Sequence, residues 1–154
     1  HTSNVYRATE QEALSDRLCE LSGMDEVFFG NSGSEANEGA LKLVRYYGHK
    51  HGNPEAQTIV MERAWHGRTL ATLAATGSEK ARKGFDPLPS GFVRVPYNDL
   101  DAVRRLGDVD RRVQAVWLEV LQGEGGIQVA DLDYLRALRK LCDERGWLLM
   151  VDEV

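Results

Sequence analysis

Hydrophobic positions along the chain follow two alternating patterns, one typical of helices and the other typical of strands. Three leucines spaced three or four residues apart predict a first helix at about 10–22. Gly23 follows and can end this helix, because glycine readily adopts the left-handed conformation. Thr9 and Glu12 have the spacing of a capping box at its start.

The rest of the chain continues this alternation. Short apolar runs predict strands at Glu26–Phe29, Thr58–Met61, Phe92–Val95, Val113–Leu118 and Trp147–Val151. Helical spacing predicts helices over Ala36–Val44, Arg68–Ala75, Asp99–Leu106 and Asp131–Arg145. The stretch Gly77–Gly91 has no clear period and predicts an irregular loop. Because parallel strands need crossover connections, the order predicts an α/β fold with a mostly parallel, doubly wound sheet.

Composition places the chain among ordinary globular domains. Its 154 residues are 42% hydrophobic and 28% charged, enough to build a core and too apolar for a disordered chain. The net charge of −5 provides no basic field for nucleic acid or for an anionic membrane surface. No apolar stretch approaches the roughly 20 residues of a membrane span, and the N-terminus lacks a signal-peptide pattern, so a cytoplasmic location is expected.

Two cysteines, Cys19 and Cys142, lie far apart, and no CxxC pair or nearby histidine accompanies them. This favours buried free thiols over a disulfide or a zinc site. The chain begins at His1 instead of a methionine and stops at Val154, directly after the last predicted strand. A strand in this position should lead into a turn and a helix. We therefore expect a fragment of a longer chain that covers one domain or most of one.

Polar residues follow the predicted strands, where ligands bind in open α/β sheets. Ser32, Gly33 and Ser34 lie between a predicted strand and a predicted helix. Glycine lets the backbone approach an anion, the serine hydroxyls donate, and the helix N-terminus adds a favourable dipole. A phosphate would fit there, although plain turn and N-cap roles are commoner for these residue types.

Two further segments carry candidate chemistry. Asp152 follows a buried strand, where a carboxylate is costly unless a cation or donors face it; a protonated pyridine nitrogen and the cap of a following helix explain it equally well. Trp65 could stack on a planar cofactor and Arg68 could bind a carboxylate, whereas core and surface roles are commoner. His66 has no partner histidine at metal-binding spacing, so no metal site is predicted.

Taken in order, four segments resemble the class III, pyridoxal-phosphate-dependent aminotransferases, and in particular their acetylornithine aminotransferase branch. The segments are Asn31–Glu38, Trp65–Thr69, Glu119–Gly126 and Val151–Val154. The similarity starts at His1-Thr2-Ser3-Asn4 and covers the whole chain. It implies a fold-type I transferase, in which residues 1–154 are an incomplete large domain that binds pyridoxal phosphate (PLP). The remainder of the large domain and the small domain would lie outside this chain.

The resemblance implies a cofactor role for six residues. Ser32–Ser34 would hold the phosphate at a helix N-terminus. Trp65 takes the place of the phenylalanine or tyrosine that usually stacks on the pyridine ring, and Val154 would pack on the opposite ring face. Asp152 matches the aspartate that pairs with the pyridine nitrogen and stabilises the negative charge developing on the substrate carbon.

Other matched residues point to the substrate. Arg68 matches the arginine that receives the α-carboxylate of the donor. Glu124 matches a glutamate that, in related ω-aminotransferases, pairs with a substrate-selecting arginine farther along the chain. Glu119 lies near the cofactor in the family without a clear role, and Val120 replaces a common proline. The family places its Schiff-base lysine downstream of the aspartate, and none of the five lysines in this chain occupies that position.

The activity that the resemblance implies is transfer of the δ-amine of N2-acetylornithine to 2-oxoglutarate, a step of arginine biosynthesis, by a homodimer. Other ω-amine donors remain open, namely ornithine, succinylornithine and 4-aminobutyrate. A related PLP enzyme, such as an aminomutase or a decarboxylase, is a further alternative. For the chain as given, a non-catalytic module that binds phosphate or PLP is the remaining alternative.

Overall fold

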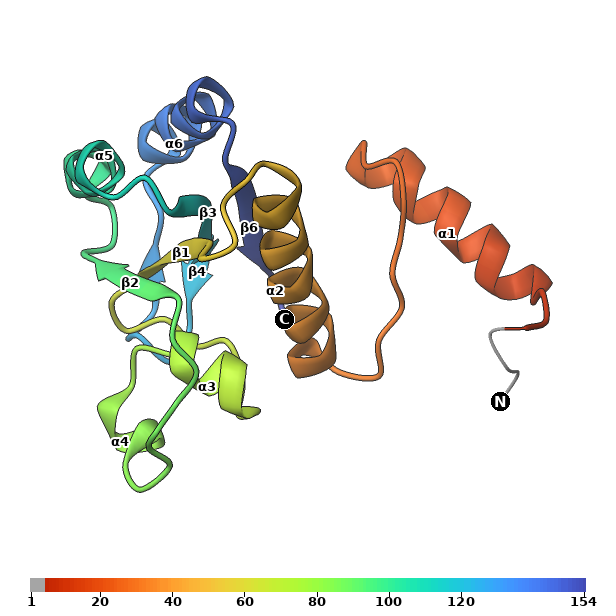
Figure 1. Cartoon of the computed structure of the whole chain (residues 1–154). Helices are drawn as coiled ribbons and strands as arrows, with labels where there is room; N and C mark the ends of the chain where they lie inside the picture. The colour runs from red at the N-terminus through yellow and green to blue at the C-terminus, as the bar shows by residue number, and fades with distance from the viewer. Residues whose placement is uncertain (1–4) are drawn as a thin grey trace. The chain divides into compact units, whose positions relative to one another are not determined.

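The structure is a computed structural model that describes residues 5–154 (Figure 1). Residues 1–4, where the family resemblance begins, lie outside the described part. The chain divides into two compact units, residues 1–31 and residues 32–154. The second unit contains the sheet and every predicted site residue.

The first unit is built around helix α1 (Thr9–Ser22). Gly23 ends this helix in the left-handed conformation, at φ 70°, as predicted. The predicted capping box is wrong, because Thr9 is already the first helical residue and Ala8, the N-cap, makes no side-chain cap bond. Glu12 is paired with Arg7 instead, at 2.6 Å.

Apolar side chains of the first unit are largely exposed in the described chain. Leu14, Leu18 and Leu21 are 50%, 38% and 67% exposed, and α1 has no buried residue. The strand predicted at Glu26–Phe29 is wrong, because a strand needs a hydrogen-bonded neighbour and residues 5–31 contain no strand. Cys19 is a free thiol and is only partly buried.

A four-stranded parallel sheet forms the centre of the second unit and confirms the predicted fold class (Figure 1). Its strands are β1 (Gln57–Met61), β2 (Phe92–Val95), β3 (Val113–Glu119) and β6 (Leu148–Asp152), in the spatial order β2-β1-β3-β6. The register between β3 and β6 pairs Glu119 with Asp152. Two carboxylates therefore stand side by side at the carboxyl edge of the sheet.

Helices cover both faces of this sheet. The helices are α2 (Gly33–Lys50), α3 (Leu70–Ala75), α5 (Leu100–Val109) and α6 (Leu132–Arg145). Val60 and Trp117 pack on Leu41 of α2, whereas their strand neighbours Ile59 and Val116 belong to the core under α5 and α6. Alternate residues of the strands thus pack into two hydrophobic cores, one on each face of the sheet. This is the doubly wound arrangement that the sequence predicted.

Short elements depart from the prediction. The predicted loop at 77–91 contains a short helix, α4 (Glu79–Arg82), which the Ser78 hydroxyl caps by accepting from the Ala81 amide at 3.3 Å. Strands β4 (Leu121–Gln122) and β5 (Gln128–Val129) form an antiparallel hairpin that was not predicted. Two-residue strands are too short to produce a recognisable alternation.

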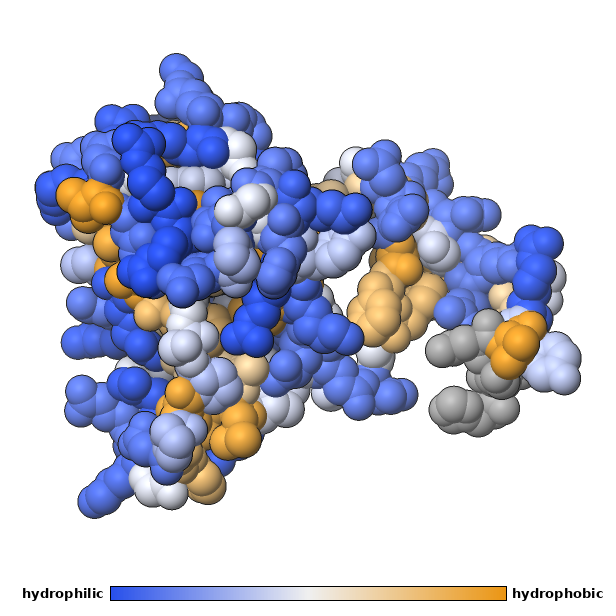
Figure 2. Space-filling view, in the orientation of Figure 1, coloured by the Kyte–Doolittle hydropathy of each residue, from blue (hydrophilic) through white to orange (hydrophobic). Residues whose placement is uncertain are grey.

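Polar residues cover most of the second unit on the face shown in Figure 2, and hydrophobic side chains gather around α4. Cys142 is a buried free thiol, as predicted. Within residues 5–154, no helix is both long enough and apolar enough to cross a membrane.

Candidate active site

Asp152, the last residue of β6, is held by two donors. Its Oδ2 accepts from Asn37 Nδ2 at 2.8 Å and from His66 Nδ1 at 2.9 Å, and its side chain is 5% exposed. Asn37 comes from α2 and His66 from the loop between β1 and α3. Three segments far apart in the sequence therefore converge on one carboxylate.

Asp152 stays ionised in this setting. Burial is the largest single influence and by itself disfavours the charged form. Hydrogen bonds from His66 and Asn37 act in the opposite direction, and together with the Val154 amide they leave the pKa of Asp152 below its usual value. The result is a shielded negative charge at the mouth of the sheet, a place where a protonated ring nitrogen would be stabilised.

His66 is a neutral donor to this carboxylate. Its side chain is fully buried and stacks on Trp117, with ring centroids 3.8 Å apart. Burial lowers the pKa of His66 below its ordinary value, although Asp152 favours the proton. Nδ1 therefore carries the hydrogen that bonds Asp152, while Nε2 has no hydrogen-bond partner within residues 5–154. Asn37 also donates to the carbonyl of His66, at 2.9 Å, and so orients both groups.

At the start of α2, neighbouring atoms leave no space for a side chain at two glycine positions. Ser32 is the N-cap, and its hydroxyl accepts from the Glu35 amide at 3.2 Å. A Cβ on Gly33 would lie 2.7 Å from the methyl groups of Val154. Gly67 has φ +128°, and a Cβ there would collide with the Ser34 hydroxyl. The two glycines are therefore required for the helix start, Val154 and the β1–α3 loop to come together.

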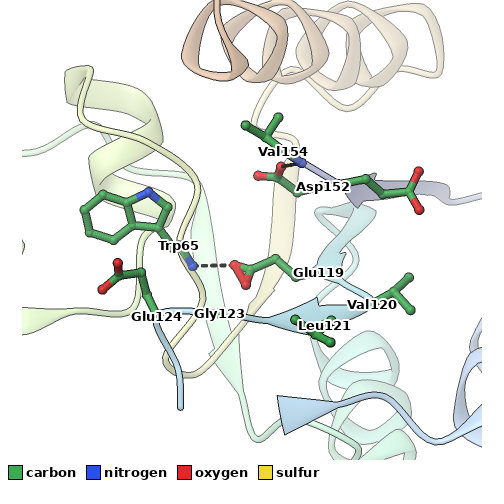
Figure 3. Close-up of a pocket in the computed structure, with 9 residues that line it drawn as sticks. Trp65, Glu119, Val120, Leu121, Gly123, Glu124, Asp152 and Val154 are labelled. Atoms are coloured by element: carbon green, nitrogen blue, oxygen red, sulfur yellow. Dashed lines mark hydrogen bonds between the residues drawn. The ribbon is translucent and has the colours of Figure 1, made fainter. Parts of the chain in front are cut away.

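Two cavities adjoin this arrangement, and they are named here after the cofactor and the amino donor that the family resemblance predicts for the residues around them. The first, the cofactor-side cavity, has a volume of about 260 Å³ and is lined by Ser32, Gly33, Ser34, Asn37, Trp65, His66, Gly67, Asp152 and Val154. The second, the donor-side cavity, has a volume of about 620 Å³ and is lined by Trp65, Glu119, Val120, Leu121, Gly123, Glu124, Asp152, Glu153 and Val154 (Figure 3). Trp65, Asp152 and Val154 line both cavities.

Comparison with known proteins decides the family. The sequence matches the family described as aminotransferase class-III over residues 1–154. The chain belongs to the class III aminotransferases.

Relatives and solved structures agree with this family. Acetylornithine aminotransferase 1 of Bordetella parapertussis is 66% identical over 154 residues, which are 100% of this chain and 39% of the relative. The ornithine aminotransferase of Toxoplasma gondii superposes with a TM-score of 0.91 at 28% identity, over 97% of this chain and 36% of that one. An amine transaminase from an uncultivated Pseudomonas species, solved in its PLP-bound form, gives a TM-score of 0.88 at 25% identity and covers 99% and 40% of the two chains.

The chain therefore spans 39% of the length of the relative from Bordetella. Membership of the family implies pyridoxal 5′-phosphate as the cofactor. All six residues predicted to contact it line the single cofactor-side cavity. The helix N-terminus, the half-buried Trp65 ring and the ionised Asp152 have the chemistry that a phosphate, a pyridine ring and its nitrogen require. The residues present thus fit this cofactor.

Predicted donor-side residues are less constrained. Arg68 is exposed, and its guanidinium lies 5.0 Å from the centre of the Trp65 ring. It has no hydrogen bond or ion pair within residues 5–154 and does not line either cavity. Glu124 is exposed at the donor-side cavity (Figure 3). In the same described range, no group of three or more His, Cys, Asp or Glu side chains could hold a metal ion.

Asn37 and His66 were given no cofactor role by the sequence reasoning, yet they hold Asp152. A signal for Asn37 was present. It lies four residues before Leu41 and seven before Val44, so it occupies the buried face of α2. A polar side chain on such a face needs a hydrogen-bond partner, and the partner here is Asp152.

Proposed function

We propose that this chain is part of a PLP-dependent aminotransferase that transfers the δ-amine of N2-acetylornithine to 2-oxoglutarate, a step of arginine biosynthesis. The observation that carries the proposal is the convergence of six predicted cofactor residues on one cavity, beside a buried, ionised Asp152. The high identity to a relative named acetylornithine aminotransferase supports the choice of donor.

When bound, PLP supplies an electron sink for the carbanion that forms on the substrate carbon. The chain's own residues position that sink. Ser32–Ser34 would bind the phosphate, and Trp65 and Val154 would enclose the ring. Asp152 would hold a proton at the ring nitrogen, because its own low pKa keeps it anionic. Asn37 and His66 keep that carboxylate in place.

The donor would be recognised by charge. Arg68 presents an exposed guanidinium that has no carboxylate partner in residues 5–154, which suits binding of the donor's α-carboxylate. Glu124 would face the substrate-selecting arginine expected elsewhere in the protein. The five lysines of this chain line neither cavity, which supports the expectation that the lysine that binds the cofactor covalently lies outside these residues.

A second candidate donor is ornithine. The solved structure with a TM-score of 0.91 is an ornithine aminotransferase, and the two donors differ only in the acetyl group on the α-nitrogen. Succinylornithine and 4-aminobutyrate are further ω-amines of the same class. Residues that distinguish these donors would have to contact the substituent on the α-carbon. None of the residues that line the donor-side cavity favours one of these donors over another.

A donor panel tests the proposal. The full-length protein is purified, reduced with borohydride and weighed intact, and its kcat/KM is measured with 2-oxoglutarate and each ω-amine. We expect a pyridoxyl adduct on a lysine beyond Val154 and the highest kcat/KM for acetylornithine. An intact protein without an adduct and without turnover of any ω-amine contradicts the proposal. Such a result would favour the alternative of a non-catalytic, phosphate-binding protein.

Assembly and location stay predictions. The family resemblance predicts a homodimer, which light scattering of the full-length protein would measure. The composition and the absence of an apolar stretch of spanning length predict a cytoplasmic location, which cell fractionation would measure.

A further inference from the structure

Glu119 is a buried carboxylate to which the proposed function assigns no task. It ends β3, it is 6% exposed, and it stands beside Asp152 in the sheet register. A carboxyl group in such a place needs donors. Burial raises the pKa of Glu119 to about 7, with backbone donors opposing and Asp152 adding to the rise.

The Trp65 amide makes a short hydrogen bond to Glu119, and the Gly123 backbone is a second donor to the same carboxyl. Glu119 Oε1 accepts from the Trp65 amide at 2.6 Å (Figure 3). On either side of Trp65 the loop is tied to the end of α3, since the Ala64 carbonyl accepts from Gly77 at 2.7 Å and the His66 amide donates to Thr76 at 3.0 Å. Within residues 5–154, Glu119 is the one partner of the Trp65 amide.

The position of Trp65 affects the shape of both cavities. Its ring lines the cofactor-side and the donor-side cavities, and the Arg68 guanidinium lies over it. A shift of the Trp65 backbone would therefore move the ring that would face the cofactor and the cation that would receive the donor carboxylate.

We propose that Glu119 is a positioning residue that fixes Trp65 through its backbone amide and so sets the place of the indole and of Arg68. The consequence for cofactor and donor rests on the proposed function, whereas the hold on Trp65 does not. An acceptor oxygen is enough for this task, because the ionised and the protonated carboxyl both offer one, and so does a glutamine amide.

Tryptophan fluorescence tests directly whether Glu119 fixes the position of Trp65. Trp117 and Trp147 are 1% and 8% exposed, whereas Trp65 is half-buried, so Trp65 is the tryptophan of this chain that acrylamide should reach. Quenching is measured on the full-length protein, and the Trp65 contribution is obtained by subtracting the signal of Trp65→Phe. We expect Glu119→Ala to raise the quenching of Trp65 and Glu119→Gln to leave it near the wild-type value.

Cofactor affinity supplies the second readout. Loss of the bond in Glu119→Ala should weaken PLP binding by roughly tenfold, with Glu119→Gln within about twofold of wild type. Glu153→Ala is the matched control, because Glu153 lines the same donor-side cavity, is exposed, and has no hydrogen bond within residues 5–154. It should change neither readout.

Several results would overturn the inference. Equal Trp65 quenching in wild type and Glu119→Ala would do so, and so would a Glu119→Gln variant as perturbed as Glu119→Ala. If Glu119→Ala does not fold, Glu119→Met replaces it in both measurements, because methionine fills the space without offering a strong acceptor. Rapid deuterium exchange of the Trp65 amide in the wild type would also contradict it. A wild type that binds no PLP refutes the proposed function and leaves the quenching comparison to decide the role of Glu119.

Discussion

The side chains expected to face the cofactor differ from those expected to meet the donor in how many hydrogen bonds fix them. On the cofactor side, Asp152 has two side-chain donors, and Gly33 and Gly67 allow backbones to meet at contact distance. The two residues expected to meet the donor are Glu124 and Arg68, of which Arg68 lines neither cavity; both are exposed and have no hydrogen bond within residues 5–154. Folding thus fixes the groups that would face the cofactor, whereas the two charged side chains that would meet the donor are exposed.

This difference has a physical reason. A cofactor that stays bound gains from groups whose orientation has been fixed by folding, because no reorganisation is then needed during the reaction. A donor must enter and leave in each cycle, and exposed side chains can adjust to it. Substitutions of the groups that would face the cofactor should therefore affect turnover and folding, whereas substitutions of the exposed Arg68 and Glu124 should affect only substrate binding.

The largest effect is expected at Asp152. Asp152→Ala removes the charge that would stabilise the protonated ring nitrogen, and kcat for acetylornithine should fall by roughly 10²- to 10³-fold. Steady-state kinetics and the absorbance of bound PLP measure this. Asp152→Glu keeps the charge and should retain more activity than Asp152→Ala. Unchanged turnover in Asp152→Ala would remove the distinction between the two sides.

Glycine substitutions sharpen the comparison through stability. Gly67→Ala places a methyl group against Ser34 and Thr72 at φ +128° and should lower the free energy of unfolding by about 1–3 kcal/mol. Gly123→Ala, on the donor side, meets nothing within 4 Å and should change stability by less than about 0.5 kcal/mol. Urea denaturation compares the two variants. Equal losses would show that the two sides are packed alike.

On the donor side, Arg68→Ala should act on KM alone. Loss of a charge-assisted bond to the α-carboxylate should raise KM for acetylornithine by roughly tenfold, with Tm unchanged because the side chain is exposed. A kinetic series with donors that have or lack this carboxylate measures the effect, and the donor without it is the control. A fall in Tm, or equal losses with both donors, would contradict a pure binding role.

The smallest effect concerns pH. In the folded chain the pKa of Glu119 is raised from 4.5 to about 7, so the folded state holds an extra proton between these values. The stability that Glu119 contributes is complete below about pH 4.5 and is lost as pH rises to about 7. His66 and Asp152, whose pKa values are lowered, act in the opposite sense in wild type and variant alike.

Glu119→Gln cannot titrate and isolates this contribution. Its Tm relative to wild type should therefore rise between about pH 5 and about pH 8, which thermal denaturation in a buffer series measures. A difference that stays constant over this range would mean that the Glu119 carboxyl keeps its ordinary pKa in the fold.

Sequence patterns predicted the sheet because the signals are local. Alternate residues of β1 and β3 face two cores, and such runs of apolar residues mark buried parallel strands. The same approach failed at Glu26–Phe29, which has a strand-like composition but no neighbouring strand in residues 5–31. It also failed at the β4–β5 hairpin, whose strands are two residues long. The hydrophobic pattern of a segment does not show whether a neighbouring strand is available to pair with it. A strand of two residues is also too short to produce such a pattern.

The sequence by itself indicated the strands of the parallel sheet, the family, and six of the nine residues that line the cofactor-side cavity. It also carried a polar residue, Asn37, on an otherwise apolar helix face. Only the tertiary structure decided that this residue and His66 hold Asp152, from 115 and 86 positions away. The hold of Glu119 on Trp65, across 54 positions, was decided in the same way. Contacts at such separations depend on how the sheet and helices pack, and no local spacing encodes them.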